Sequence, residues 1–162
     1  MSDAFKALLV ENVHPDADQA LQGFGPVEIE RRPGSPDRED LLKRIPGAHV
    51  LGIRSRTQAD EDLIAAAENL LAIGCFCIGT NQVDLDAAAR RGVPVFNAPF
   101  GNTRSVAELT IASVIMLMRR IPEKMFAIDR GDWVKTAEAA DEVRKKKPGI
   151  VGHCPFGAQR TV

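Results

Sequence analysis

The stretch Ala72–Arg120, AIGCFCIGTNQVDLDAAARRGVPVFNAPFGNTRSVAELTIASVIMLMRR, decides the fold of this chain. It opens as an apolar strand that enters a polar turn at 79–82. A short helix and a second strand follow, and the loop 97–108, NAPFGNTRSVAE, then leads into a long apolar helix. In α/β proteins the loops at the carboxyl ends of parallel strands hold ligands. We therefore expect a ligand site on these two loops.

Upstream of this stretch, strand-like and helix-like segments alternate strictly. Apolar runs predict strands at 7–10, 27–30, 49–53, 72–77 and 93–96. Helical spacing and cap residues predict helices at 15–22, 36–45, 61–71 and 84–91, with Ser35 and Asp60 as N-terminal caps. This alternation predicts an α/β fold with a doubly wound, mostly parallel sheet and right-handed crossovers. Periodicity does not give the strand order, and we expect a flavodoxin-like one.

The long helix begins at a motif typical of a helix N-terminus. Ser105 and Glu108 form an S-x-x-E capping box ahead of an apolar run, and we expect the helix to run to about Arg120 and to stop before Pro122. Apolar residues occupy nearly its whole circumference, which predicts burial on several sides between two bodies. A shorter helix at 122–133 and a charged, exposed connector at 135–147 should follow.

Composition and charge exclude several classes of protein. The 162 residues are 44% hydrophobic and 27% charged with a net charge of −1, an ordinary globular mixture. So small a net charge argues against a nucleic-acid or anionic-membrane partner bound through the overall electrostatic field of the protein. The three cysteines form no disulfide framework, so we expect a reducing, cytoplasmic compartment. We expect no signal peptide, no membrane span and no metal site.

Two polar groups follow predicted strands. Arg54 and Ser55 come after the third strand, where a guanidinium can hold a carboxylate or phosphate with two hydrogen bonds. A surface ion pair with a nearby acid explains Arg54 equally well. After the fourth strand, Gly79 lets the backbone approach a ligand closely. We interpret Cys75 and Cys77 as small buried apolar residues rather than nucleophiles.

The last two motifs lie further along the chain. Asn102 precedes the long helix, whose N-terminus favours an anionic ligand, although the side chain could equally stabilise the turn. The terminal run 152–157, GHCPFG, resembles a dinucleotide-binding G-x-G-x-x-G motif. Gly152 and Gly157 stand at its first and third glycines, but Cys154 replaces the second and Pro155 removes a backbone donor. This fingerprint is weak.

The run IGCFCIGTNQVDLDAAARRGVPVFNAPFGNTRSVAEL closely resembles the D-isomer-specific 2-hydroxyacid dehydrogenase family, within it the bacterial phosphoglycerate dehydrogenases. The likeness extends from LLVENVH near the start, through GIRSRT, to RGDW and KPGIVG. The resemblance implies NAD as cofactor and oxidation of 3-phosphoglycerate to 3-phosphohydroxypyruvate in serine synthesis. It implies a substrate domain at 1–101, an interdomain helix and connector at 102–147, and the start of a Rossmann domain at 148–162.

The resemblance also assigns residues and a partner. It implies substrate-binding roles for Arg54, Ser55, Ile78, Gly79 and Asn102. It implies cofactor-binding roles for Ile78, Asn102, Val106, Gly152, Pro155, Phe156 and Gly157. In this family the helix also supports dimerisation, so the resemblance implies a homo-oligomer through 105–120, with a small molecule as substrate.

Departures from the family pattern qualify this interpretation. The family's catalytic histidine, its acid partner and its substrate-orienting arginine have no counterpart here, so we expect this chain to be inactive alone. Five replacements near the end suggest a decayed gene, a truncated frame or a read error: Pro148, His153, Cys154, Pro155 and Phe156. An alternative is a non-catalytic module that dimerises with a full-length relative. A signalling receiver is set aside, because Arg54 stands where its phosphorylated aspartate would.

Overall fold

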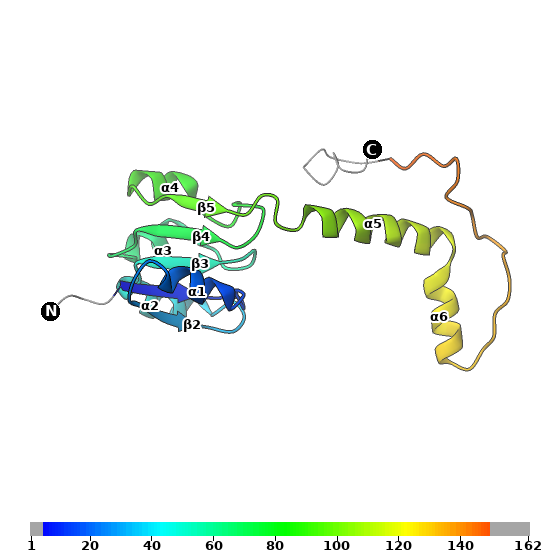
Figure 1. The fold of residues 1–162 in the computed structure, drawn as a ribbon, viewed down its shortest axis with the longest axis horizontal. Coiled ribbons are helices and arrows are strands. Elements are labelled where there is room, and N and C mark those ends of the chain that lie inside the picture. Colours follow the sequence, from blue (N-terminus) through cyan, green and yellow to red (C-terminus); the bar gives the residue numbers. More distant parts are fainter. Residues whose placement is uncertain (1–4, 150–162) are drawn as a thin grey trace. The chain divides into compact units, whose positions relative to one another are not determined.

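The computed structural model describes residues 5–149 of the chain. The chain divides into two compact units, Met1–Gly101 and Asn102–Val162. The first unit contains a sheet and its helices, and the second contains two helices followed by an extended segment (Figure 1). Each unit has its own secondary-structure elements and is described separately below.

The first unit is built on a sheet of five parallel strands. These are β1 (Phe5–Leu9), β2 (Val27–Arg31), β3 (Val50–Ile53), β4 (Ala72–Cys75) and β5 (Val95–Asn97). Their order in the sheet is β2-β1-β3-β4-β5, which is the order of flavodoxin-like folds. The predicted α/β fold, the parallel sheet and the expected strand order are confirmed.

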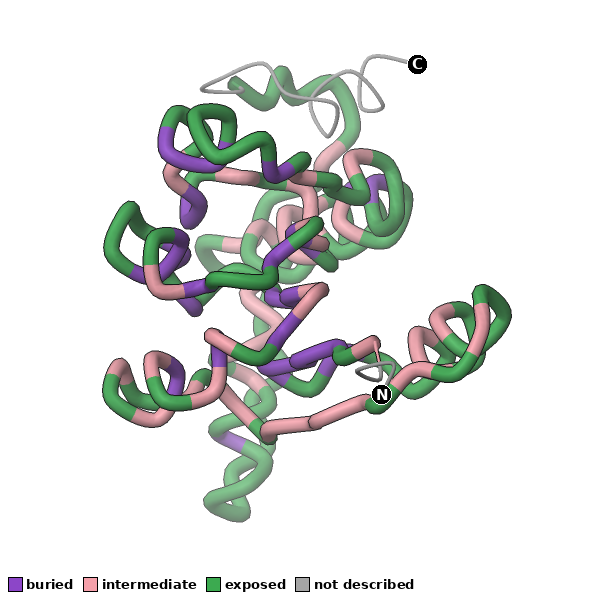
Figure 2. Tube along the Cα trace, turned by 90° about the vertical axis from the view of Figure 1, so that its left-hand side faces the viewer, coloured by how far each residue is buried: buried purple, intermediate pink, exposed green. Residues whose placement is uncertain are grey.

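Helices connect the strands and cover both faces of the sheet. They are α1 (Asp16–Gln22), α2 (Arg38–Arg44) with a 3₁₀ turn η1 (Ile45–Gly47), α3 (Glu61–Ala66) and α4 (Leu85–Arg90). The chain reverses its direction of winding after β2, so right-handed crossovers put α1 on one face and α2, α3 and α4 on the other. One continuous core fills the space between these three helices and the sheet, and Figure 2 shows the buried positions in purple.

The other face of the sheet has glycines at its centre. Gly52 of β3 is in register with Gly74 of β4, which is in register with Phe96 of β5. Residues in register point to the same side, so a strip without side chains spans the two central strands β3 and β4. The Cε2 atom of Phe76 lies 3.0 Å and 3.4 Å from Cβ positions built on Gly52 and Gly74. Phe76 therefore covers this strip, while Phe96 beside it is 63% exposed.

Aspartates cap three helices of the first unit. Asp37, Asp60 and Asp84 each accept a hydrogen bond from the backbone N–H three residues later, at 2.8 to 3.0 Å. The predicted cap at Asp60 is confirmed. The predicted cap at Ser35 is wrong, because the carboxylate of Asp37 takes that role and the Ser35 hydroxyl bonds to that of Thr57 at 3.0 Å.

The second unit contains α5 (Thr103–Met118) and α6 (Ile121–Asp129). The predicted capping box is wrong. The helix starts before Ser105, and Glu108 pairs with Arg104 one turn away at 2.6 Å instead of reaching back. The two helices are separated by Arg120, whose left-handed backbone (φ 53°) breaks the hydrogen-bonding pattern. Pro122 accordingly lies in the first turn of α6 rather than ending α5, since a proline is tolerated in a first turn.

The expected burial of α5 on several sides is not found. Within this helix only Thr103 and Ala107 are buried. The exposed large apolar residues are Leu109, Ile111, Ile115, Met116 and Leu117. The apolar residues around the helix make it able to bind a partner surface, but the sequence pattern alone does not show that such a surface is present. Helix α5 therefore presents a large apolar surface.

Candidate functional site

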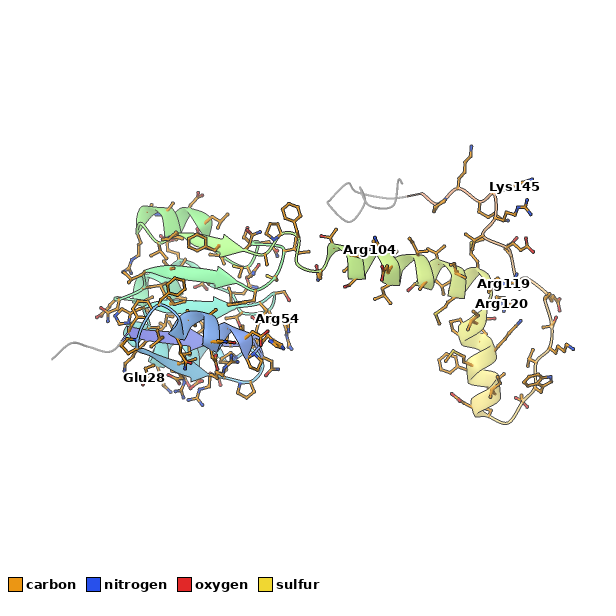
Figure 3. The ribbon with its side chains drawn as sticks, in the orientation of Figure 1. Glu28, Arg54, Arg104, Arg119, Arg120 and Lys145 are labelled. Atoms are coloured by element: carbon orange, nitrogen blue, oxygen red, sulfur yellow. The ribbon has the colours of Figure 1, made fainter. Side chains whose placement is uncertain are left out.

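The candidate site lies at the carboxyl edge of the sheet, in the loops that follow β1, β3 and β4. Figure 3 shows Arg54 at this edge, where the strand arrows end. Because β1, β3 and β4 are neighbours in the sheet, their following loops lie together although they are far apart in the sequence. This is the edge where parallel α/β sheets place ligands.

The loop after β3 is held by a carboxylate from the loop after β1. The Oε1 atom of Glu11 accepts hydrogen bonds from the backbone N–H groups of Arg54 (3.1 Å) and Thr57 (2.8 Å). Its Oε2 atom accepts one from the N–H of Arg56 at 3.0 Å. Glu11 is only 6% exposed, so these three donors replace the water that its charge would otherwise require.

The hydrogen bonds decide the charge of Glu11. Burial by itself raises the pKa of this carboxyl, but the bonds from Thr57, Arg56 and Arg54 lower it and prevail, so the pKa lies below its ordinary value. An ionised carboxylate only accepts hydrogen bonds, which fits a pocket made of donors. Glu11 is therefore an anion at neutral pH.

The arginine side chains of the same loop are uncommitted. Arg54 and Arg56 are exposed. Within residues 5–149 neither guanidinium forms an ion pair. By contrast, Arg31 pairs with Asp18 and Arg44 pairs with Glu30, each at 2.5 Å. The alternative of a surface ion pair for Arg54 is thus not found. Two guanidinium groups remain available for an anionic ligand.

The loop after β4 offers backbone donors. The N–H groups of Ile78 and Gly79 donate no hydrogen bond to any other described residue. A Cβ atom on Gly79 would lie 2.7 Å from Oδ1 of Asn81, so a side chain there would crowd the loop. Consecutive uncommitted N–H groups in such a turn form a small anion-binding concavity.

Gln82 joins the two loops. Its Nε2 atom donates to the carbonyl oxygen of Arg54 at 2.6 Å and to that of Gly79 at 3.3 Å, and it lies 3.2 Å from the sulfur of Cys77. Gln82 is 3% exposed. The structure therefore brings Arg54 and Gly79, predicted as separate site residues, into one hydrogen-bonded arrangement.

The outer side of the β4 loop is fixed by β5. The side-chain amide of Asn97 donates to the carbonyl oxygen of Ile78 at 2.7 Å, and the N–H of Ala98 donates to that of Cys77 at 3.0 Å. With these carbonyl groups engaged on one side, the N–H groups of Ile78 and Gly79 remain as the polar groups available to a ligand.

The two cysteines near the site differ in their surroundings. Cys75 is buried in the core, and burial raises the pKa of its thiol to about 11, with a smaller effect from Cys77. A thiol with such a pKa is a poor nucleophile at neutral pH. Cys77 is half-buried and donates from Sγ to the carbonyl oxygen of Gly79 at 3.2 Å. Both cysteines therefore have a structural role, as the sequence indicates, rather than that of a nucleophile.

The second unit contains the other predicted site residues that are described. Asn102 is the residue preceding α5, and its side chain forms no capping hydrogen bond. Thr103 begins α5, and its buried Oγ1 atom has no hydrogen-bond partner among the described residues. Val106 lies in the first turns of α5 and is half-buried. The N-terminus of α5 thus has uncommitted polar groups beside its helix dipole.

The remaining predicted cofactor contacts lie outside the described residues, at Gly152, Pro155, Phe156 and Gly157. Sequence reasoning missed Glu11, Arg56 and Gln82. The only available signal was that Glu11 and Arg56 lie two and three residues after the ends of β1 and β3. Nothing in the local pattern distinguishes Gln82 from a solvent-exposed glutamine.

Residues 5–149 contain neither a candidate metal site nor a candidate membrane-spanning helix. No group of three or more histidine, cysteine, aspartate or glutamate side chains is arranged to hold a metal ion. No helix in this part of the chain has the length and apolar character needed to cross a membrane.

The chain is similar to known dehydrogenases. Residues 7–147 match the family model described as D-isomer specific 2-hydroxyacid dehydrogenase, catalytic domain. Over 157 residues the chain is 55% identical to D-3-phosphoglycerate dehydrogenase of Escherichia coli K12, covering 97% of this chain and 38% of that protein. D-3-phosphoglycerate dehydrogenase 1 of Saccharomyces cerevisiae is 45% identical, with 97% of this chain and 33% of that protein covered. These matches confirm the resemblance predicted from the sequence.

A solved structure gives the same fold. The NAD⁺-bound 3-phosphoglycerate dehydrogenase of Entamoeba histolytica aligns with a TM-score of 0.70 at 23% identity, covering 98% of this chain and 49% of that one. At this identity the likeness shows the fold alone. The chain spans 38% of the length of the bacterial relative, so function has to be argued from the site.

Proposed function

The chain belongs to the D-isomer specific 2-hydroxyacid dehydrogenase family, and we propose that it binds the substrate for the NAD-dependent oxidation of 3-phosphoglycerate to 3-phosphohydroxypyruvate, without catalysing this reaction alone. One observation carries the proposal. The guanidinium groups of Arg54 and Arg56, which form no ion pair within residues 5–149, share an edge of the sheet with the N–H groups of Ile78 and Gly79, which bond to no described residue. This is a site for a small molecule with two anionic ends.

Each end of 3-phosphoglycerate has a matching group. We assign the phosphate to the guanidinium of Arg54, with Ser55 as a neighbouring donor, because a guanidinium fork fits phosphate oxygens. We assign the carboxylate to the N–H groups of Ile78 and Gly79, where the absence of a side chain at 79 leaves the backbone accessible. The resemblance to the family adds Asn102, whose side chain forms no capping hydrogen bond, as a further proposed contact.

The cofactor is assigned by family, with residues of this chain in supporting roles. When bound, NAD would accept the hydride that leaves C2 of the substrate, and the hydroxyl proton would pass to a general base that is not among the residues assigned to the ligand. Ile78, Asn102 and Val106 are proposed to contact the nicotinamide, which needs an apolar surface and a polar group for its carboxamide. The uncommitted Asn102 amide and the half-buried Val106 fit that need. We propose residues 1–101 as the substrate domain, 102–147 as interdomain helix and connector, and 148–162 as the start of the cofactor domain.

The binding test uses the 162-residue chain and three ligands. Calorimetric titration with 3-phosphoglycerate should give saturable binding. D-Glycerate lacks the phosphate and glycerol 3-phosphate lacks the carboxylate. Each should therefore bind at least about tenfold more weakly than 3-phosphoglycerate, the effect expected for one lost charge-assisted contact. Equal affinity for all three ligands would contradict the proposed assignment.

A variant pair locates the phosphate. Arg54→Gln should weaken 3-phosphoglycerate binding about tenfold or more while leaving the affinity for D-glycerate unchanged. Arg90→Gln is the control, because Arg90 is a surface arginine that pairs with Glu61. If both variants bind 3-phosphoglycerate as the unmodified chain does, Arg54 has no such role.

We further propose that the chain forms a homo-oligomer through α5, and that it works in the cytoplasm. The exposed apolar surface of α5 supports association, since Leu109 and Leu117 are each 68% exposed. The free thiols of Cys75 and Cys77 suit a reducing compartment. Sedimentation equilibrium should show association that the double variant Leu109→Gln/Leu117→Gln abolishes. Leu71→Gln, at a leucine 58% exposed in the first unit, should leave it unchanged.

A further inference from the structure

Glu11 is a buried acid outside the set of residues assigned to the ligand. Its carboxylate accepts from the backbone N–H groups of Arg54, Arg56 and Thr57. Its own N–H donates to the carbonyl oxygen of Gly34 at 2.6 Å. The side chain therefore reaches from the end of β1 into the loop after β3, where three hydrogen bonds hold it, and a fourth fixes the Glu11 backbone.

The backbone at this point is bent in an unusual way. Glu11 and the following Asn12 both have left-handed conformations, with φ of 60° and 54°. For residues other than glycine this conformation costs on the order of 1 kcal/mol or more each, and it persists where surrounding contacts impose it. The bend carries the chain away from the sheet and leaves the Glu11 carboxylate among the loop donors.

The partners of Glu11 are backbone groups, and this leaves the arginine side chains uncommitted. Although Glu11 lies beside Arg54 and Arg56, no described ion pair joins its carboxylate to either guanidinium. Its charge is balanced instead by N–H dipoles, which orient the loop. These N–H groups are thereby occupied, so an incoming anion meets the guanidinium groups rather than the loop backbone.

The loop so oriented is connected to the second half of the site. The carbonyl oxygen of Arg54 accepts from Gln82, which also donates to the carbonyl oxygen of Gly79. A chain of hydrogen bonds therefore runs from Glu11 through Arg54 and Gln82 to Gly79. Both loops that bear ligand-binding groups lie on this chain.

From this arrangement we infer that Glu11 is a positioning residue, which sets the Arg54–Thr57 loop and, through Gln82, the Ile78–Gly79 donors for an anionic ligand. The inference deepens the proposed function and, for the ligand it names, rests on it. Glu11 itself does not contact the ligand, because its two carboxylate oxygens are fully engaged with the loop.

The first experiment needs neither a ligand nor a variant. NMR spectra of the chain are recorded while the pH is lowered from 7 to 3. The N–H signals of Arg54, Arg56 and Thr57 should shift together with one midpoint below 4.5, the ordinary value, because the pKa of Glu11 is lowered. The side-chain NH₂ of Gln82 and the N–H of Gly79 should shift with the same midpoint. If Gln82 and Gly79 do not respond at that midpoint, Glu11 fastens its own loop only and the inference is overturned.

The second experiment measures binding. Glu11→Gln keeps the shape of the side chain but places its NH₂ group against the backbone N–H donors of the loop. It should raise the Kd for 3-phosphoglycerate at least about tenfold. Asp37→Asn is the matched control, because Asp37 also accepts a backbone N–H, from Asp40 at 2.8 Å, and asparagine caps equally well. An unchanged Kd in Glu11→Gln would overturn the inference.

The outcomes separate this inference from the proposed function. If the unmodified chain does not bind 3-phosphoglycerate, the proposed function fails, and the coupled pH response of Gln82 and Gly79 still decides whether Glu11 organises both loops. If the chain binds and Glu11→Gln binds equally well, the proposed function stands and the positioning role fails. If Glu11→Gln does not fold, the pH experiment on the unmodified chain is decisive by itself.

Discussion

The side-chain amide of Gln82 donates a 2.6 Å hydrogen bond to the backbone carbonyl oxygen of Arg54, 28 residues earlier in the chain. The same nitrogen lies near the carbonyl oxygen of Gly79 and the sulfur of Cys77. All three neighbours act as acceptors toward it, and Gln82 is almost fully buried. Gln82 is thus the buried side-chain donor between the two ligand-bearing loops, which backbone hydrogen bonds of Ala59 with Gln82 and Asp84 also join.

Replacing that donor should be costly. Gln82→Glu puts a carboxylate against three acceptors and should lower the free energy of unfolding by about 1–3 kcal/mol, the cost of leaving buried polar groups unsatisfied. Gln58→Glu makes the same change at an exposed glutamine whose contact to the carbonyl oxygen of Arg56 is 3.5 Å, and it should be nearly neutral. Urea denaturation measures both, and equal losses would contradict the role given to Gln82.

The two central glycines of the sheet should differ sharply in tolerance. A Cβ on Gly52 would lie 2.5 Å from Cδ2 of the fully buried Leu9 and 3.0 Å from Phe76, whereas a Cβ on Gly74 meets only Phe76 at 3.4 Å. Gly52→Ala should destabilise the protein by about 1–3 kcal/mol through overpacking. Gly74→Ala, on the same face of the next strand, should change stability little. Thermal unfolding of both variants checks this, and similar transition temperatures would contradict it.

Neighbouring arginines on α4 and its end should also differ. Arg91 donates to the carbonyl oxygens of Ile64 (2.7 Å) and Ala65 (2.6 Å) at the end of α3, where a cation also meets the negative end of the helix dipole. Arg91→Met should therefore cost about 1–2 kcal/mol of unfolding free energy. Arg90→Met removes only an exposed pair with Glu61 and should cost less than about 0.5 kcal/mol. Urea midpoints of the two variants make the comparison, and a larger loss in Arg90→Met would refute it.

Stability should fall in acid partly because of Glu11. The pKa of Glu11 is lower in the folded than in the unfolded chain, so its contribution is complete above about 4.5 and is lost as the pH falls through the lower folded value. The difference in unfolding free energy between the unmodified chain and Glu11→Gln should therefore shrink as the pH goes from 7 to 3. Urea denaturation at several pH values measures it, and a constant difference would contradict the pKa assignment.

Local patterns predicted the sheet well, because each strand is a short apolar run bounded by polar turns. Ile73 and Cys75 read as a buried strand and are one. Helix starts were less certain where two caps compete within a few residues. Ser35 and Ser105 each matched a cap pattern, yet Asp37 supplies the better acceptor in the first case and the helix begins at Thr103 in the second.

The site was half predictable for a different reason. Arg54 and Gly79 could be identified because each follows a strand, and the ends of parallel strands meet at one edge. Glu11 and Gln82 could not, because their roles depend on contacts between residues 28 to 46 positions apart. Such contacts follow from strand order and loop conformation, which hydrophobic periodicity does not encode.

The bend at Glu11 and Asn12 has a consequence for the order of folding. The donors that hold it lie 43, 45 and 46 residues further along the chain. Local interactions alone therefore do not stabilise this turn, and closing so long a loop is entropically unfavourable until β1 and β3 have paired. We therefore expect the bend to form late, after the central strands have assembled, and the end of β1 to take its final conformation only once residues 54–57 have been synthesised.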